Sequence, residues 1–257
     1  MNRWIEYYLS VQDRINYGIL VLNVNSDCTF HCRNCSSWYK GKNQRKGVTA
    51  EETRKLFEHL DKEGILPRNI ILHGGEPFLN PEFGEIVNIV EKYCAFKIVS
   101  NGTMLTRENV ELMKRCEFVS FSVYPGTRAI YDKLQESKIL KDLQTSCRSI
   151  NYAVMNSFDN INGGEREPQS NFEQCSWQKI CKVISPEGLY RCWFLYKNNE
   201  DAYPLTREGV LECLSGTKAF ERCRYCTPEL REPHVSDSPE IDKKAVEQAL
   251  RTIDAYS

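Results

Sequence analysis

The sequence predicts an α/β protein built on a parallel β-sheet. Short runs of aliphatic and β-branched residues alternate with segments whose apolar residues recur at the helical period, and short connections join them. Repeated units of this kind form parallel sheets with helices packed on them. The 257 residues suffice for one such domain and a small appendage. Ligands of parallel sheets bind outside the carboxyl ends of the strands, so the residues after each strand are the first candidates for a site.

Five strands are expected. The first, GILVLNVNS at residues 18–26, is an aliphatic run typical of a buried strand. The others are expected at residues 69–77, 96–105, 118–126 and 149–155, and the sequence does not place a sixth. Beyond them, residues 157–171 are rich in glycine, asparagine and charge and are expected to form a loop.

Amphipathic helices are expected between these strands. Thr49 and Glu52 have the spacing of a capping box, which predicts a helix that runs to about Lys62. Its apolar stripe would contain Leu56 and Leu60. Further helices are expected at residues 81–93, 106–115 and 127–138, and a charged C-terminal helix at residues 240–253.

Three cysteines follow the first expected strand: Cys28, Cys32 and Cys35. A four-iron cluster needs four ligands, so three thiolates would leave one iron open to a small molecule. A zinc site with a distant fourth ligand could use the same residues.

The second expected strand ends in Gly74, Gly75, Glu76 and Pro77. Two glycines let the backbone approach a ligand closely, and the Glu76 carboxylate can accept a hydrogen bond from an ammonium group. His73, immediately before them, could reach a substrate or could serve packing.

Small polar residues follow the next two strands. Ser100 and Asn101 end the third and suit a ribose or a carboxylate. The fourth places Ser120, Ser122 and Tyr124 on one face by the period of two. Tyr124, like His73, is a candidate catalytic residue.

The spacing C-x3-C-x2-C, followed by GGEP and the polar strand ends, resembles the radical S-adenosylmethionine (radical SAM) enzymes. In that family the open iron chelates the amino and carboxylate groups of SAM, and an electron from the cluster cleaves SAM to a 5'-deoxyadenosyl radical. The resemblance implies that residues 74–77 hold the SAM amino group. It also implies a partial (βα)6 TIM-type barrel over residues 15–160, and an electron donor such as flavodoxin or ferredoxin. Many members have an aromatic residue on the adenine where this chain has Asn34.

Six of the twelve cysteines lie between residues 175 and 226. Residues 181–196 are expected to form a β-hairpin with its turn at residues 186–188. Thiolates before the hairpin, after it and in a later C-x2-C could bind a cluster or zinc. The arrangement resembles the twitch region of radical SAM enzymes, which implies a second 4Fe-4S cluster. Its implied ligands are Cys175, Cys192, Cys223 and Cys226, with Cys181 competing with Cys175. This region would cover residues 161–230 and a C-terminal helix residues 231–257.

The remaining cysteines are expected in the core. Cys94, Cys116 and Cys147 lie singly near apolar segments, and free cysteine commonly behaves as a small buried hydrophobe. Cys213, in an expected helix, has the same interpretation.

Composition excludes several classes of function. A formal net charge of -1 gives no electrostatic reason to expect nucleic acid. The N-terminal residues carry scattered charges, so no signal peptide is expected, and no apolar run approaches the length of a membrane span. Twelve cysteines without a secretory signal indicate metal ligation in a reducing cytoplasm rather than disulfides.

Two clusters would allow oxidation of an alcohol. Hydrogen abstraction from a carbon that bears a hydroxyl leaves a ketyl radical, and an auxiliary cluster can accept its electron, as the resemblance to twitch-containing aminocyclitol dehydrogenases implies. If a thiol or Tyr124 returned a hydrogen atom instead, the product would be an epimer. No peptide-recognition domain is seen ahead of residue 18, which favours a small carbohydrate-like or natural-product substrate. The alternatives are maturation of a ribosomal peptide and a non-catalytic metal-binding protein.

Overall fold

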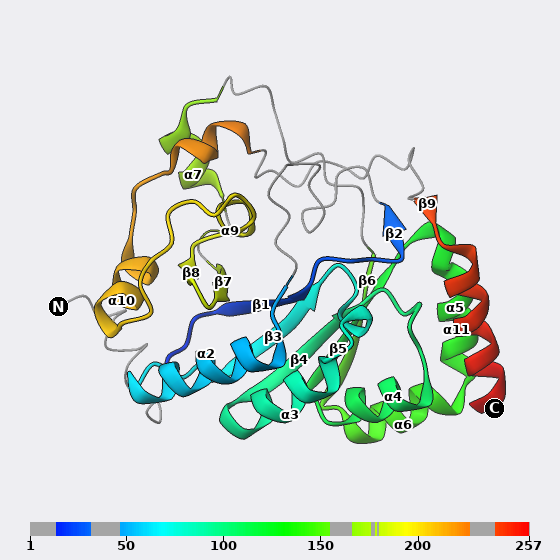
Figure 1. Ribbon diagram of the computed structural model, residues 1–257. Coiled ribbons are helices and arrows are strands. Elements are labelled where there is room, and N and C mark those ends of the chain that lie inside the picture. Colours follow the sequence, from blue (N-terminus) through cyan, green and yellow to red (C-terminus); the bar gives the residue numbers. More distant parts are fainter. Residues whose placement is uncertain are drawn as a thin grey trace.

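The structure is a computed structural model that describes residues 14–31, 47–154, 166–175, 178, 180–226 and 240–256. Its centre is a seven-stranded sheet in the order β6-β5-β4-β3-β1-β7-β8 (Figure 1). The strands are β1 (Ile19–Asn25), β3 (Asn69–Gly74), β4 (Ala95–Ser100), β5 (Phe118–Val123), β6 (Ser149–Val154), β7 (Cys181–Ser185) and β8 (Gly188–Tyr190). A separate pair joins β2 (Phe30–His31) to β9 (Glu240–Ile241).

Every neighbouring pair in the large sheet is parallel except the β7–β8 hairpin. The predicted parallel α/β fold of the partial TIM-type barrel class is therefore confirmed, as are the five expected strands. The expected hairpin also forms. It joins the same sheet, because β7 pairs in parallel with β1 from Ile19↔Cys181 to Leu22↔Ile184. The proposed division at residues 160 and 230 stays a prediction.

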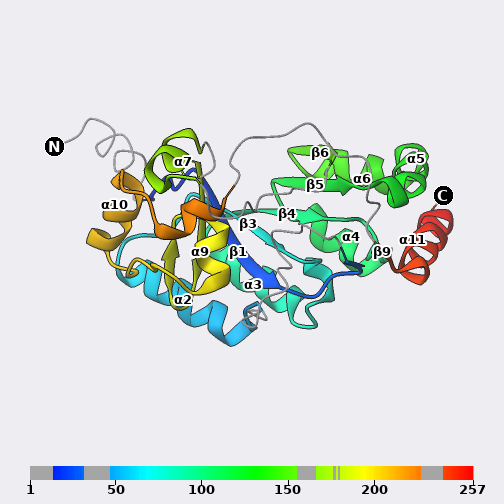
Figure 2. The ribbon, with the colours of Figure 1, turned by 90° about the horizontal axis from the view of Figure 1, so that it is seen from above.

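Helices cover one face of the sheet and gather at its hairpin end, as the view from above shows (Figure 2). The capping box predicted for the first described helix is present, since the Thr49 amide donates to the Glu52 carboxylate and the Glu52 amide to Thr49 Oγ1. The helices are α2 (Ala50–Lys62), α3 (Phe83–Tyr93), α4 (Arg107–Lys114), α5 (Arg128–Glu136), α6 (Lys138–Ser146), α7 (Pro168–Gln174), α9 (Trp193–Asn198), α10 (Arg207–Ser215) and α11 (Lys243–Tyr256).

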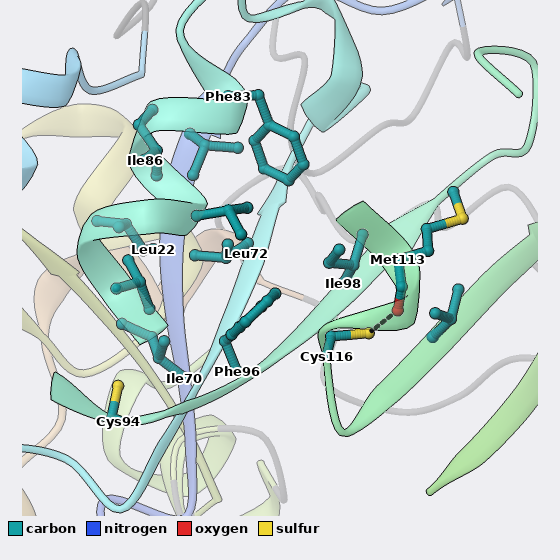
Figure 3. Packing of buried hydrophobic residues seen from close by; sticks show 14 of the residues in the cluster. Leu22, Ile70, Leu72, Phe83, Ile86, Cys94, Phe96, Ile98, Met113 and Cys116 are labelled. Atoms are coloured by element: carbon teal, nitrogen blue, oxygen red, sulfur yellow. Dashed lines mark hydrogen bonds between the residues drawn. The ribbon is translucent and has the colours of Figure 1, made fainter. Parts of the chain in front are cut away.

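The two faces of the sheet bury different side chains. Leu20 and Leu22 of β1 point into the main apolar core beneath helices α2 to α6. Figure 3 shows Leu22 in this core beside α3. The alternate residues Val21 and Asn23 point to the opposite, inner face, where Val21 packs with Leu195 of α9. Residues of the inner face are therefore the ones that α9 can contact.

Four cysteines lie in the main core, as predicted. Cys94, Cys116, Cys147 and Cys213 are all buried there. Figure 3 shows Cys116 with its thiol directed at the carbonyl of Met113. Within the described residues, no helix is long and apolar enough to cross a membrane.

Candidate functional site

The carboxyl ends of β1 and β3 are joined by backbone hydrogen bonds. The Gly75 amide donates to Asn25 O over 2.7 Å, and the Glu76 amide donates to Asp27 O over 2.8 Å. A Cβ atom on Gly74 would lie 2.0 Å from Asn25 O, and one on Gly75 would lie 2.2 Å from Asp27 O. Glycine is thus required at both positions because the backbone of residues 25–27, which leads into the loop of Cys28, Cys32 and Cys35 (the cysteine loop), passes so close. The sequence pattern alone attributes the two glycines to the close approach of a ligand.

Glu76 ties the end of β3 to the end of β4. One carboxylate oxygen accepts from Ser100 Oγ and the other from the backbone N–H of Asn101, each over 2.8 Å. The side chain is fully buried, and burial raises its pKa to about 7, although the Asn101, Ser100 and Phe78 hydrogen bonds act against this. Both carboxylate oxygens therefore accept hydrogen bonds from residues at the end of β4. A direct bond from Glu76 to the SAM ammonium group stays a prediction. Pro77 follows in a buried 3-10 turn.

Asn101 connects the end of β4 to the first cysteine of the loop. The side-chain Nδ2 of Asn101 donates to Cys28 Sγ over 3.5 Å and to Thr29 Oγ1 over 3.1 Å. The Thr29 hydroxyl is also bonded to Thr103, 2.8 Å away. Cys28 is partly buried. Cys32 and Cys35 lie outside the described residues, and their role as ligands stays a prediction.

Tyr131 of α5 fixes the end of β5 beside that of β4. Its hydroxyl donates to Ser122 O over 2.8 Å and to Asn101 O over 3.0 Å. Sequence reasoning missed Tyr131, because a tyrosine on the apolar stripe of a helix has no signal of its own. Ser122 is buried at this edge. The Tyr124 ring meets the edge of the Phe30 ring, with centroids 5.0 Å apart, which places it near the cysteine loop.

His73 lies on the inner face of β3 as the register partner of Asn23. Its ring meets the ring of Trp193 edge-on, with centroids 5.3 Å apart. Burial, and then the charge of Lys197, lower its pKa to about 4. The imidazole is therefore neutral at pH 7.

Comparison with known proteins identifies this arrangement. The family model described as the radical SAM superfamily matches residues 22–165, more than half of the chain. The chain belongs to the radical SAM superfamily. No curated protein matches its sequence.

Solved structures share the radical SAM fold at low sequence identity. BtrN in complex with AdoMet and 2-DOIA is 17% identical with a TM-score of 0.56, over 82% of this chain and 92% of BtrN. Native anSMEcpe with bound AdoMet is 12% identical with a TM-score of 0.55, over 93% of this chain and 96% of the other. Streptococcus suis SuiB bound to precursor peptide SuiA is 11% identical with a TM-score of 0.50, over 87% of this chain and 73% of SuiB.

The described residues fit the cofactors of a radical SAM enzyme, a 4Fe-4S cluster and SAM. Cys28 is held at the carboxyl edge of the sheet by the Asn101 amide, a donor suited to a thiolate. The ends of β1, β3 and β4 converge on it through Glu76 and Gly75. Cys28 would be the described ligand of the cluster, with SAM beside it, and this assignment stays a prediction.

The cysteines expected at a second site lie in the C-terminal half, and several of them interact. α7 packs on the 3-10 turn that contains Cys223, and the Asn171 amide donates to the carbonyls of Cys223 and Cys226. Burial raises the pKa of the Cys192 thiol to about 12; the Leu195 and Phe194 amides oppose this, and Cys223 and Cys226 add to it. Among the described residues, no three His, Cys, Asp or Glu side chains are close enough to hold a metal ion. A second cluster stays a proposal.

Cys175 lies at the end of α7 and interacts with two other thiols. It adds to the increase that burial produces in the pKa values of Cys223 and Cys181. Burial raises the pKa of Cys181 to about 11, and Lys182 opposes this increase. The choice between Cys175 and Cys181 as the ligand therefore stays open.

Two buried cations lie beside these cysteines. Arg191 is only 1% exposed and donates to the carbonyls of Glu212, Cys213 and Gly216, so it caps the end of α10. Lys182 is 2% exposed, and it opposes the increase that burial produces in the pKa values of Cys213 and Cys181. Sequence reasoning missed both, because arginine and lysine side chains are normally exposed.

Proposed function

We propose that the protein oxidises or epimerises a hydroxyl-bearing carbon of a small carbohydrate-like or natural-product substrate. In the oxidation, a second 4Fe-4S cluster on Cys175, Cys192, Cys223 and Cys226 would accept the electron of the substrate radical. The observation that carries the proposal is the path of α9. This helix begins after Cys192 and returns along the inner face of β1, so that Lys197 Nζ donates to Ser26 Oγ, two residues before Cys28. One short helix thus connects the two groups of cysteines.

When bound, SAM and its cluster supply a carbon-centred radical that abstracts hydrogen from the substrate. The chain's own residues then have to move a proton and favour the transfer of an electron. His73, neutral at pH 7, accepts the substrate hydroxyl proton at Nδ1, an atom with no hydrogen-bond partner in the described part of the chain. Arg191 opposes the increase that burial produces in the pKa of the Cys223 thiol, and the buried Lys182 interacts with Cys192. The two charges would therefore favour ionised thiolates at the second site and its acceptance of an electron.

A peptide substrate is the second candidate, since SuiB is bound to a precursor peptide. Coverage does not separate the two candidates, since the chain covers 92% of BtrN, which is bound to AdoMet and 2-DOIA, and 96% of native anSMEcpe with bound AdoMet and Kp18Cys peptide.

The test is anaerobic turnover with chemical reductant, SAM and a panel of deuterated sugars and aminocyclitols. The proposal predicts 5'-deoxyadenosine that contains substrate deuterium, together with an oxidised or epimerised product. The Cys32→Ala variant should form neither. Unchanged SAM cleavage in Cys32→Ala would support a non-catalytic metal-binding protein, and deuterium transfer only from a peptide would support a maturase.

A further inference from the structure

A polar group lies on the inner face of the sheet, between the two sets of cysteines. Asn23 of β1 is 1% exposed and pairs in register with His73 of β3. Trp193 of α9 packs against His73, and Lys197 lies one turn further along α9. We call Asn23, His73, Trp193 and Lys197 the inner polar group.

Three atoms of the inner polar group are buried and have no hydrogen-bond partner in the described part of the chain. They are Asn23 Oδ1, His73 Nδ1 and Trp193 Nε1, two acceptors or potential acceptors and one donor. Asn23 Nδ2 is satisfied, because it donates to Tyr196 OH over 3.0 Å and to Ser26 Oγ over 3.3 Å. The orientation of Asn23 is therefore fixed by the fold, and its oxygen is directed away from those two partners. Buried polar atoms are almost always bonded, so three neighbouring exceptions indicate a site for a ligand.

Lys197 adds a positive charge to the same place. Its side chain is 7% exposed, and Nζ lies 5.3 Å from the centroid of the Trp193 ring. Nζ shares Ser26 Oγ with the Asn23 amide, which keeps the ammonium beside Asn23. After burial, the charge of Lys197 is the second cause of the lowered pKa of His73, so the two side chains lie near one another. An ammonium next to neutral donors and acceptors suits a molecule that has an anionic group beside hydroxyls.

We propose that the inner polar group binds the substrate, and that this substrate is a hydroxylated small molecule with one carboxylate or phosphate group. The inference rests on the proposed function and specifies its substrate class. Lys197 binds the anionic group, while Trp193 Nε1 and Asn23 Oδ1 bind hydroxyls. His73, on the neighbouring strand, then faces the hydroxylated part of the molecule.

The experiment measures binding by calorimetry on anaerobically reconstituted protein, with D-glucose, D-glucuronate and D-glucose 6-phosphate as probes. At least one charged sugar should bind about tenfold or more tightly than D-glucose, and the preferred one identifies the anionic group as carboxylate or phosphate. Lys197→Met should bring the charged sugars to within about twofold of D-glucose, whereas Lys197→Arg should keep a preference. Lys244→Met, a change of an exposed lysine in α11, should leave all three affinities at the wild-type values.

Trp193→Phe provides a second variant that keeps an aromatic ring and removes only the N–H donor. This variant should bind all three sugars more weakly, by a similar factor of roughly five to tenfold, and should keep the preference for charged over neutral sugars. A merely structural role would instead give equal losses in both variants, and that result overturns the inference. Equal affinity of the wild type for charged and neutral sugars, or binding of none of the probes, also overturns it.

SAM cleavage by the wild type, measured on the same preparation, separates this inference from the proposed function. Cleavage without a preference for charged sugars contradicts the inference alone. A preference that Lys197→Met removes, in a protein that does not cleave SAM, supports the binding site and contradicts the proposed function.

Discussion

At the scale of single residues, the carboxylate of Glu76 controls how β3 and β4 meet. Its two oxygens accept from Ser100 and Asn101 in a fully buried place. Asn101 in turn bonds to Cys28. The side chain of Glu76 is therefore connected to the cysteine loop through Asn101, and its contact with the SAM ammonium group stays a prediction.

Replacement of Glu76 by alanine should weaken SAM binding by at least about tenfold, because two buried donors lose their acceptor. Glu76→Gln should bind SAM nearly as well as the wild type. Its Oε1 can accept from the Asn101 amide, and its Nε2 can donate to the Ser100 hydroxyl. Anaerobic equilibrium binding of SAM measures both. If Glu76 holds the SAM ammonium by its charge, glutamine will lose as much affinity as alanine.

His73 should make stability depend on pH. Its pKa is lowered from 6.5 to about 4 in the folded protein, so the unfolded chain takes up a proton at a higher pH than the native one. The stability that neutral His73 contributes is complete above about pH 6.5 and is lost as the pH falls towards 4. Between pH 7.5 and 5.5 the free energy of unfolding of the wild type should fall by about 1 kcal/mol more than that of His73→Gln. Thermal unfolding at the two pH values tests this, and equal losses would show that the imidazole is not shielded.

At the scale of elements, the contact between β1 and β3 requires glycine. Gly74→Ala places a Cβ 2.0 Å from Asn25 O, so the backbone before Cys28 must move. This variant should bind substantially less iron at the first site after anaerobic reconstitution. Gly84→Ala is the matched control, because the nearest atom to its Cβ is Leu112 Cδ1 at 3.9 Å. Wild-type iron content in Gly74→Ala would show that the turn tolerates a side chain.

The cap of α10 by Arg191 should be important for stability. Arg191→Met leaves the carbonyls of Glu212, Cys213 and Gly216 without this donor and should cost about 2 kcal/mol, or roughly 4–8 °C in thermal midpoint. Arg148→Met removes an arginine whose side chain is 81% exposed and should change the midpoint by no more than about 2 °C. Equal midpoints for the two variants would contradict the role of Arg191.

Local pattern predicted most elements. The capping box at Thr49, the aliphatic run of β1 and the hairpin turn before Gly188 each depend on neighbouring residues, and each was confirmed. The expected loop at residues 157–171 was wrong at its end, because α7 begins at Pro168. Proline is favoured in the first turn of a helix, and that signal was overlooked. Lys197 could not be predicted, since only tertiary packing on β1 buries its charge.

At the scale of the whole molecule, the strand that leads to Cys28 and the hairpin that leads to Cys192 belong to one sheet. The division at residues 160 and 230 stays a prediction, and the structure adds that β7 continues the sheet beside β1 and that α9 crosses its inner face. A sequence pattern cannot show this, because pairing between strands far apart in the chain depends on which sheet edge is open. Figure 1 shows β7, β8 and α9 beside β1, and this arrangement is what the proposed transfer of an electron requires.

Iron and sulfide content, with electron paramagnetic resonance, tests the two-cluster proposal most directly. Anaerobically reconstituted wild type should hold about eight irons. The triple alanine variant of Cys28, Cys32 and Cys35 should hold about four, and its signal should not respond to SAM. The quadruple alanine variant of Cys175, Cys192, Cys223 and Cys226 should hold about four, with a signal that does respond. About four irons in the wild type and none in the triple variant would contradict the second cluster, and with it the route for the substrate electron.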